Sequence, residues 1–183
     1  MIGHSSPGST PPRSNIELKA RVADLDRLRE IAQRLATQPL ETQHQVDTYF
    51  HCRRGRLKLR EINDRRAELI WYERADQKQP KPSHYGLVPV DDPTALKQAL
   101  AGTVGIRVIV EKQREIYLYQ NVRIHLDRVV DLGTYLEFES VLDDDIDART
   151  ATAQLDFLIG EFGIAEDALC TGSYAEMLEE HDC

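Results

Sequence analysis

The stretch Arg123-Ile124-His125-Leu126-Asp127 alternates three ionisable side chains with two large apolar ones. Leu136-Glu137-Phe138-Glu139 repeats the same alternation a few residues later. Because successive side chains of a β-strand point to opposite sides, each stretch has one charged face and one apolar face. The fold depends on which of the two faces points to the interior.

The same pattern recurs along the chain. Ionisable residues stand two apart in three further strand-like segments, and an arginine follows an aromatic residue at this spacing in a fourth: Glu17/Lys19, Lys58/Arg60, Lys112/Arg114 and Tyr72/Arg74. The interleaved residues in the first two of these segments are large and apolar: Ile16, Leu18, Leu57 and Leu59.

Two arrangements satisfy this pattern. In the first, the charged faces form the solvent side of an ordinary sheet. In the second, the apolar faces pack under helices and the charged faces meet inside a closed barrel. The second arrangement has the helices it needs, and its mixture of Lys, Arg and carboxylates suits a site for phosphate and a divalent metal ion.

Periodicity and turn signals predict about eight antiparallel strands with helices packed outside them. Strands are expected over residues 15–22, 45–51, 56–62, 68–75, 85–90, 107–114 (with 115–119 extending or following it), 122–129 and 134–141. Helices are expected at about 24–38, 91–101, 148–162 and 173–180, and a Pro-rich loop at 77–82. Asp24 as an N-cap, Gly163 as a stop, and the Ser173/Glu176 capping box support these helix boundaries.

Bulk properties restrict the class of protein. A chain of 183 residues suits one domain, which we expect at 15–180 after a disordered leader at 1–14. The net charge of −8 argues against general nucleic-acid binding. There is no long apolar run and no signal-peptide pattern, so we expect a cytoplasmic protein that does not enter a membrane. Three widely spaced cysteines make a disulfide framework or a structural zinc site improbable.

Several short motifs together resemble one known family. Asn15-Ile16-Glu17-Leu18-Lys19 resembles the N-terminal E-x-E-x-K signature of the CYTH, or triphosphate tunnel metalloenzyme, superfamily. Similar segments of class IV adenylyl cyclases occur in the same order as residues 110–117, 123–127, 132–139, 162–164 and 173–178. The resemblance therefore covers nearly the whole chain, from about residue 15 to residue 178.

This resemblance implies a fold of the α+β class that is mainly β: a closed eight-stranded antiparallel barrel with charged residues inside. It implies that metal ions are held by Glu17, Glu137 and Glu139, and that Asp127 lies close to them. It implies a triphosphate gripped by Lys19, Lys58, Arg60, Arg74, Lys112, Arg114 and Arg123. Asp127 and Arg60 are the candidate catalytic residues, while the role of His125 on the same face stays open.

The family implies a metal-dependent enzyme that uses Mg²⁺ or Mn²⁺ and acts on a small-molecule triphosphate. The motifs are most similar to those of adenylyl cyclases, which convert ATP to cyclic AMP and pyrophosphate. A triphosphatase and a non-catalytic triphosphate-binding protein are the alternatives, and a homodimer is consistent with the family. The chain departs from the signature at Asn15, which stands where the first glutamate is expected and adds no negative charge.

Overall fold

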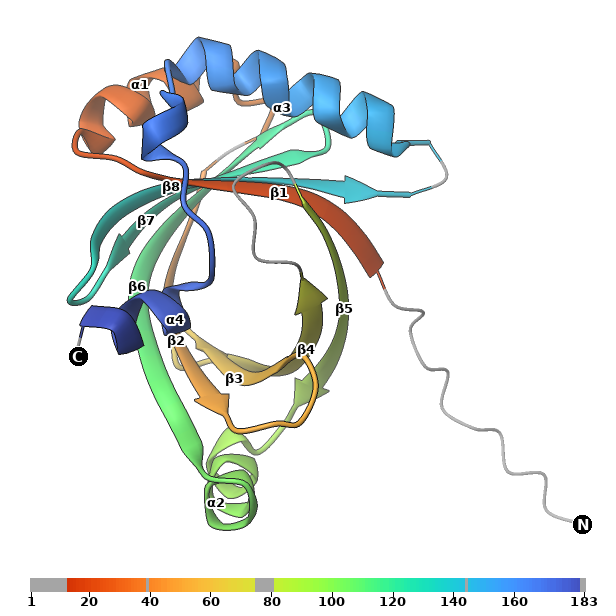
Figure 1. The fold of residues 1–183 in the computed structure, drawn as a ribbon, viewed down its shortest axis with the longest axis vertical. Helices are drawn as coiled ribbons and strands as arrows, with labels where there is room; N and C mark the ends of the chain where they lie inside the picture. Colours follow the sequence, from red (N-terminus) through yellow and green to blue (C-terminus); the bar gives the residue numbers. More distant parts are fainter. Residues whose placement is uncertain (1–12, 39, 75–80, 144, 182–183) are drawn as a thin grey trace, which may run out of the picture.

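The computed structural model describes residues 13–38, 40–74, 81–143 and 145–181. In this part of the chain, eight antiparallel strands close into one barrel in the order β1-β5-β4-β3-β2-β6-β7-β8, with β8 pairing back to β1 (Figure 1). The strands are β1 (Arg13–Arg21), β2 (Glu41–Phe50), β3 (Arg56–Ile62), β4 (Arg66–Arg74), β5 (Lys81–Val90), β6 (Ile106–Tyr119), β7 (Val122–Val129) and β8 (Gly133–Leu142). The predicted closed eight-stranded barrel is confirmed.

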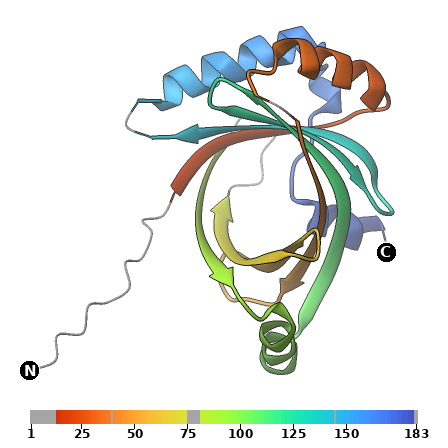
Figure 2. The same cartoon turned by 180° about the vertical axis from the view of Figure 1, so that it is seen from behind.

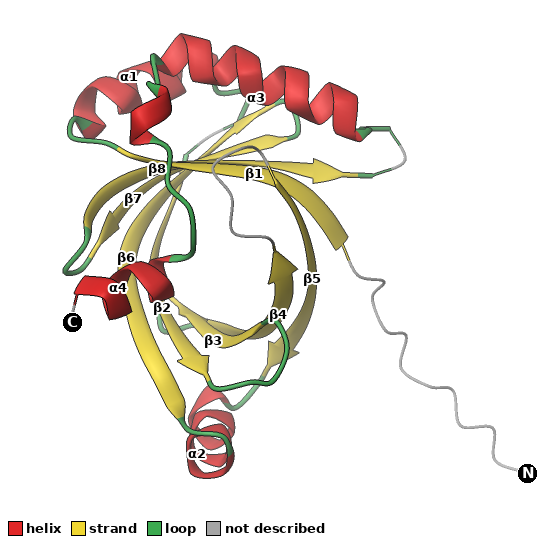
Figure 3. Ribbon diagram, in the orientation of Figure 1, coloured by secondary structure: helices red, strands yellow, loops and turns green. Residues whose placement is uncertain are grey.

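The helices lie outside the ring of strands (Figure 3). They are α1 (Leu25–Leu35), α2 (Pro93–Thr103), α3 (Ala148–Phe162) and α4 (Tyr174–His181), with a short 3₁₀ turn η1 (Glu166–Ala168). Each expected cap is present: the Asp24 carboxylate accepts from the Arg27 amide at 3.0 Å, and Gly163 ends α3 with φ 63°. No helix among the described residues combines the length and the apolar composition that crossing a membrane requires.

The apolar strand faces point outward, under the helices. Helix α3 lies across β8 and β1, and α1 lies next to α3 over β7 and β6 on the same side of the barrel, while α2 lies on the opposite side (Figures 1 and 2). The main core joins α1 and α3 to the outer face of the barrel: Ile16, Leu18, Ile124, Leu126, Leu136 and Phe138 with Leu28, Ile31, Leu155, Leu158 and Phe162. This packing leaves the charged faces inside, as the second arrangement requires.

Several element boundaries differ from the prediction by two or more residues; among them, β4 begins at Arg66 and α1 ends at Leu35. β1 begins two residues early, at Arg13, and β2 begins at Glu41. The loop predicted for 77–82 was wrong at Lys81 and Pro82, which belong to β5, while 77–80 lie outside the described residues. Pro82 stands opposite Ile16 within the short β1–β5 ladder. A proline can occupy a strand position whose N–H is not needed for pairing. A prediction from the Pro-rich composition alone therefore placed the end of the loop too late in the sequence.

Candidate active site

The barrel encloses a cavity of about 430 Å³, which lies within the range usual for small-ligand sites. All eight strands contribute side chains to its wall, and Ser173 and Tyr174 are added from the start of α4. The described cationic side chains in the wall are Lys19, Lys58, Arg60, Arg66, Lys112, Arg114 and Arg123. The described carboxylates are Glu17, Glu41, Asp47, Glu68, Glu137 and Glu139.

Most of the predicted site residues lie in this wall. The structure brings together Glu17, Lys19, Lys58, Arg60, Lys112, Arg114, Arg123, Glu137 and Glu139, and His125 stands among them. Of the predicted residues whose side chains the structure describes, Asp127 does not line the cavity, because it is fully buried next to Arg114, which stands opposite it in the β6–β7 ladder. The side chain of Arg74 lies outside the part of the chain that the structure describes.

A buried ion cluster occupies the side of the cavity formed by β2, β3 and β6. The Asp47 carboxylate accepts from Lys58 at 2.9 Å, from Lys112 at 2.8 Å and from Arg60 Nε at 2.7 Å. Burial alone would raise the pKa of Asp47, but Arg60, Lys112 and Lys58 hold it well below its usual range. Burial lowers the pKa of Lys112 to about 8, although Asp47 opposes this shift.

Sequence reasoning missed Asp47. The search used ionisable residues two apart, and the strand predicted at 45–51 carries Asp47 as its single acid, within a polar alternation of Gln43, Gln45, Asp47 and Tyr49. All four side chains line the cavity. The alternation itself was therefore the available signal, since four polar or aromatic residues at period two indicate one shared face.

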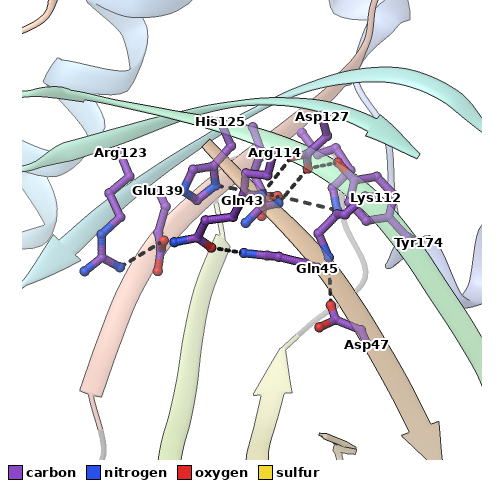
Figure 4. Close-up of polar contacts among 12 residues, drawn as sticks. Gln43, Gln45, Asp47, Lys112, Arg114, Arg123, His125, Asp127, Glu139 and Tyr174 are labelled. Atoms are coloured by element: carbon purple, nitrogen blue, oxygen red, sulfur yellow. Dashed lines mark hydrogen bonds and ion pairs between the residues drawn. The ribbon is translucent and has the colours of Figure 1, made fainter. Parts of the chain in front are cut away.

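Arg114 is held by two carboxylates (Figure 4). Its guanidinium donates to both oxygens of Asp127, at 2.7 and 2.6 Å, and to Glu137 at 2.8 Å. The Tyr174 hydroxyl donates to the same Asp127 carboxylate at 2.7 Å. Because Asp127 is fully buried and binds both Arg114 and Tyr174, it orients the Arg114 guanidinium, which lines the cavity.

Helix α4 is tied to the rim of the barrel. Arg56 Nε donates to Glu176 at 3.0 Å, and Arg107 Nε donates to Glu179 at 2.7 Å. The Lys19 ammonium lies 3.7 Å from the centre of the Tyr174 ring, a cation–π contact. The helix therefore adds an aromatic wall to the cavity that no strand pattern could reveal.

The carboxylates of β8 face Asn15 and His125. The Asn15 amide donates to Glu139 at 2.6 Å, and Arg123 donates to the same carboxylate at 3.2 Å. His125 Nδ1 lies 4.0 Å from Glu137. Burial lowers the pKa of His125, with Arg114 adding to the effect.

These residues have the donor chemistry that a hard divalent cation prefers. Glu17, Glu137 and Glu139 offer carboxylate oxygens, and the buried Asn15 Oδ1 has no hydrogen-bond partner among the described residues. An oxygen left unpaired beside two carboxylates fits a metal ligand. Within the described chain, no three His, Cys, Asp or Glu side chains already converge on one point. A bound cation would therefore draw carboxylates from their present partners.

Comparison with known proteins agrees with this geometry. The PH1012 protein from Pyrococcus horikoshii has a TM-score of 0.76 and 25% identity over 88% of this chain and 98% of its own. A Vibrio parahaemolyticus protein described provisionally as an adenylate cyclase has a TM-score of 0.68 and 19% identity, over 90% of this chain and 97% of its own. No curated protein matches. The sequence model of the CYTH domain matches residues 13–174, so this chain, with its closed barrel and charged interior, belongs to the CYTH domain family.

Proposed function

We propose that the barrel interior is the active site of a class IV adenylyl-cyclase-like enzyme, which converts ATP to cyclic AMP and pyrophosphate. The observation that carries this proposal is the concentration of buried cations in the wall. Lys58, Lys112 and Arg114 are each less than a tenth exposed, yet all three line the cavity. Lys58 and Lys112 share the one carboxylate of Asp47 with Arg60, so positive charge is in excess on this side of the wall. A triphosphate is an anion large enough to contact several of these cations at once.

The mixture of charges suits a triphosphate that enters together with a metal ion. The described wall holds seven Lys or Arg side chains and six carboxylates. A polyanion alone would be repelled by the carboxylates, and a cation alone by the lysines and arginines. A triphosphate with a divalent cation satisfies both groups, which is why we favour this pair of ligands.

Mg²⁺ or Mn²⁺ would be held by Glu17, Glu137 and Glu139, with the carbonyl oxygen of Asn15 beside them. When bound, this ion would lower the pKa of the ribose 3′-hydroxyl and neutralise charge on the phosphates. Arg114 now pairs with Glu137, and Arg123 pairs with Glu139. Both arginines would be available to bind phosphate oxygens once these carboxylates bind the ion.

In the proposed reaction, the ribose 3′-hydroxyl gives its proton to water, its oxygen forms a bond to the α-phosphorus, and the bond from that phosphorus to the pyrophosphate oxygen breaks. Lys58, Arg60 and Lys112 would stabilise the charge that develops on the leaving pyrophosphate. Arg114, oriented by Asp127, would hold the α-phosphate at the correct angle. The residues of the chain thus contribute positioning and electrostatic stabilisation rather than covalent chemistry.

An apolar part of the wall favours a nucleotide over inorganic triphosphate. Four aliphatic side chains and four tyrosines line the cavity beside the charged groups: Ile62, Ile70, Leu87, Ile116, Tyr49, Tyr72, Tyr85 and Tyr174. Inorganic triphosphate has no apolar group that could pack against this surface. A nucleoside has a base, whose apolar face stacks on aromatic and aliphatic side chains.

Product analysis tests the proposal. Purified protein is incubated with ATP, and separately with tripolyphosphate, in the presence of Mg²⁺ or Mn²⁺. We expect cyclic AMP and pyrophosphate from ATP, with loss of both products in the Arg60→Ala variant and not in the exposed-arginine control Arg54→Ala. Orthophosphate without cyclic nucleotide would identify a triphosphatase instead. Tight triphosphate binding without any product would identify a non-catalytic binding protein.

A further inference from the structure

Besides Gln45 Oε1, two buried polar atoms in the cavity wall have no hydrogen-bond partner among the described residues: Asn15 Oδ1 and His125 Nδ1. The two residues are 3% and 4% exposed. Folded proteins rarely leave such atoms unpaired, because burial without a partner is costly. The two atoms therefore indicate a group that the protein is built to bind.

These two atoms flank the same strand. β8 lies between β1, which carries Asn15, and β7, which carries His125. Glu137 and Glu139 stand two apart on β8 and share its inner face. Asn15 contacts Glu139, and His125 stands directly opposite Glu137 in the β7–β8 ladder. Each unpaired atom is thus next to a carboxylate that already carries a proposed metal role (Figure 4 shows His125 and Glu139).

Glu137 does not satisfy the imidazole. The distance from His125 Nδ1 to Glu137 Oε2 is 4.0 Å, beyond hydrogen-bonding range. The spacing is too long for a direct hydrogen bond, so Glu137 leaves the buried Nδ1 atom available to another partner.

A buried water is the competing explanation. Gln45 Oε1 on β2 is also unpaired and lines the cavity, and a water there would satisfy it. The surroundings of Asn15 and His125 differ from those of Gln45, because their neighbours are the carboxylates of Glu139 and Glu137. Several hydrogen-bond acceptors therefore lie close together around Asn15 and His125. A water has two protons to donate, whereas a divalent cation binds several acceptors at once.

We propose that His125 Nδ1 is a nitrogen ligand of the divalent cation held by Glu137 and Glu139, with Asn15 Oδ1 as a further ligand. This inference deepens the proposed function and rests on it for the presence of the ion. A mixed nitrogen and oxygen site favours a transition-metal ion such as Mn²⁺ over Mg²⁺, which prefers oxygen ligands only. The neutral ligands Asn15 and His125 would thereby determine which ion the site selects.

The test is Mn²⁺ binding to the full metal-free chain without substrate, followed by pulsed electron paramagnetic resonance. We expect modulation from a coordinated ¹⁴N nucleus in wild type and in the matched control His44→Asn, a histidine on the outer face of β2. In His125→Asn we expect the nitrogen modulation to disappear and the preference for Mn²⁺ over Mg²⁺ to fall at least about tenfold, one power of ten in the ratio of binding constants.

A second measurement needs no variant and covers the case in which His125→Asn does not fold. Wild-type protein labelled with ¹⁵N only at histidine should replace the ¹⁴N modulation with a ¹⁵N coupling. Absence of nitrogen coupling in wild type, or unchanged coupling in folded His125→Asn, would overturn the inference. The measurement omits substrate, so nitrogen coupling with no binding of ATP or tripolyphosphate would refute only the proposed function.

Discussion

The Asp47 carboxylate on β2 and the Arg60 guanidinium on β3 form a two-point pair, with Arg60 Nε and Nη2 donating at 2.7 and 2.8 Å. The two residues stand opposite each other in the β2–β3 ladder. Lys58 and Lys112 bind the same carboxylate, so one acid that is 1% exposed faces three cations. A phosphate entering the cavity would meet a cluster that already contains one anion.

Replacing Asp47 by Asn should destabilise the protein strongly. The change removes the carboxylate that three buried cations share, and breaking a buried charge cluster costs about 3–5 kcal/mol of unfolding free energy. Tripolyphosphate should recover part of this loss, because its oxygens can replace the carboxylate and it binds only the folded chain. Urea denaturation with and without tripolyphosphate measures both effects.

The control for this variant is Asp26→Asn. Asp26 pairs with Arg29 on the exposed side of α1, and its side chain is 89% exposed. Exposed ion pairs contribute little to stability, so the urea midpoint should hardly move. If Asp47→Asn were as stable as this control, the cluster would not depend on its carboxylate.

Binding of triphosphate should take up a proton above about pH 8. Burial holds the pKa of Lys112 at about 8, and a phosphate beside it would raise that pKa again. Affinity should therefore fall as the pH rises through this range, because the free lysine becomes neutral. Folding has the opposite dependence: the unfolded chain binds the extra proton between about 8 and 10.5, so this group adds stability as the pH rises.

Titration calorimetry at about pH 9, in two buffers with different ionisation enthalpies, measures the proton uptake directly. The matched variant is Lys112→Arg, whose guanidinium keeps its proton at this pH and should abolish the uptake. Equal apparent enthalpies in the two buffers for wild type would contradict the prediction.

Much of the site followed from the strand pattern. The period-two spacing correctly placed Lys112 and Arg114 on one face, and likewise Glu137 and Glu139, because side-chain alternation is a local property of a strand. The pattern could not say whether these faces point inward. That depends on which face α1 and α3 cover, a tertiary fact that the family resemblance supplied.

The missing parts of the site come from contacts between residues far apart in the sequence. Tyr174 reaches Asp127 across 47 positions of sequence, from a helix that follows the last strand. The sequence predicted the helix through its capping box, but not where it would dock. Likewise, the alternation placed Asp127 on the same face as Arg123 and His125, but it could not show that Arg114 and Tyr174 would cover this carboxylate.

Replacing Asp127 by Asn should reduce turnover more than it reduces substrate binding. The amide keeps the shape but loses the charge that fixes both ends of the Arg114 guanidinium. Losing a partner that orients a site residue typically costs about 10–100-fold in activity. Steady-state kinetics should show this loss in kcat, with the dissociation constant for the substrate changed much less.

Tyr174→Phe tests the same carboxylate from its other side. It removes one hydrogen bond from a hydroxyl to a carboxylate, worth about 1.5–3 kcal/mol, but leaves both contacts of Asp127 with Arg114, so its kinetic effect should be smaller than that of Asp127→Asn. Wild-type kcat in a folded Asp127→Asn protein would show that the orientation of Arg114 does not limit the reaction.

Replacing Glu137 by Gln should move metal binding and metal-free triphosphate binding in opposite directions. Glu137 is a proposed metal ligand that also neutralises Arg114 at 2.8 Å and stands 4.0 Å from Lys19. Without its charge, the divalent cation should bind at least about tenfold more weakly, and metal-dependent turnover should fall with it. In the presence of a chelator, however, tripolyphosphate should bind as tightly as in wild type or more tightly, because two cations lose a competing anion.

Calorimetry with Mn²⁺ alone, and with tripolyphosphate in a chelator, separates the two effects. The control is Glu61→Gln on the outer face of β3, where Glu61 pairs with Lys97 of α2 and should affect neither ligand. Loss of both affinities together would indicate a damaged barrel rather than a lost ligand. Unchanged Mn²⁺ affinity in Glu137→Gln would remove this residue from the metal site, and the observed pairing with Arg114 would then be its whole role.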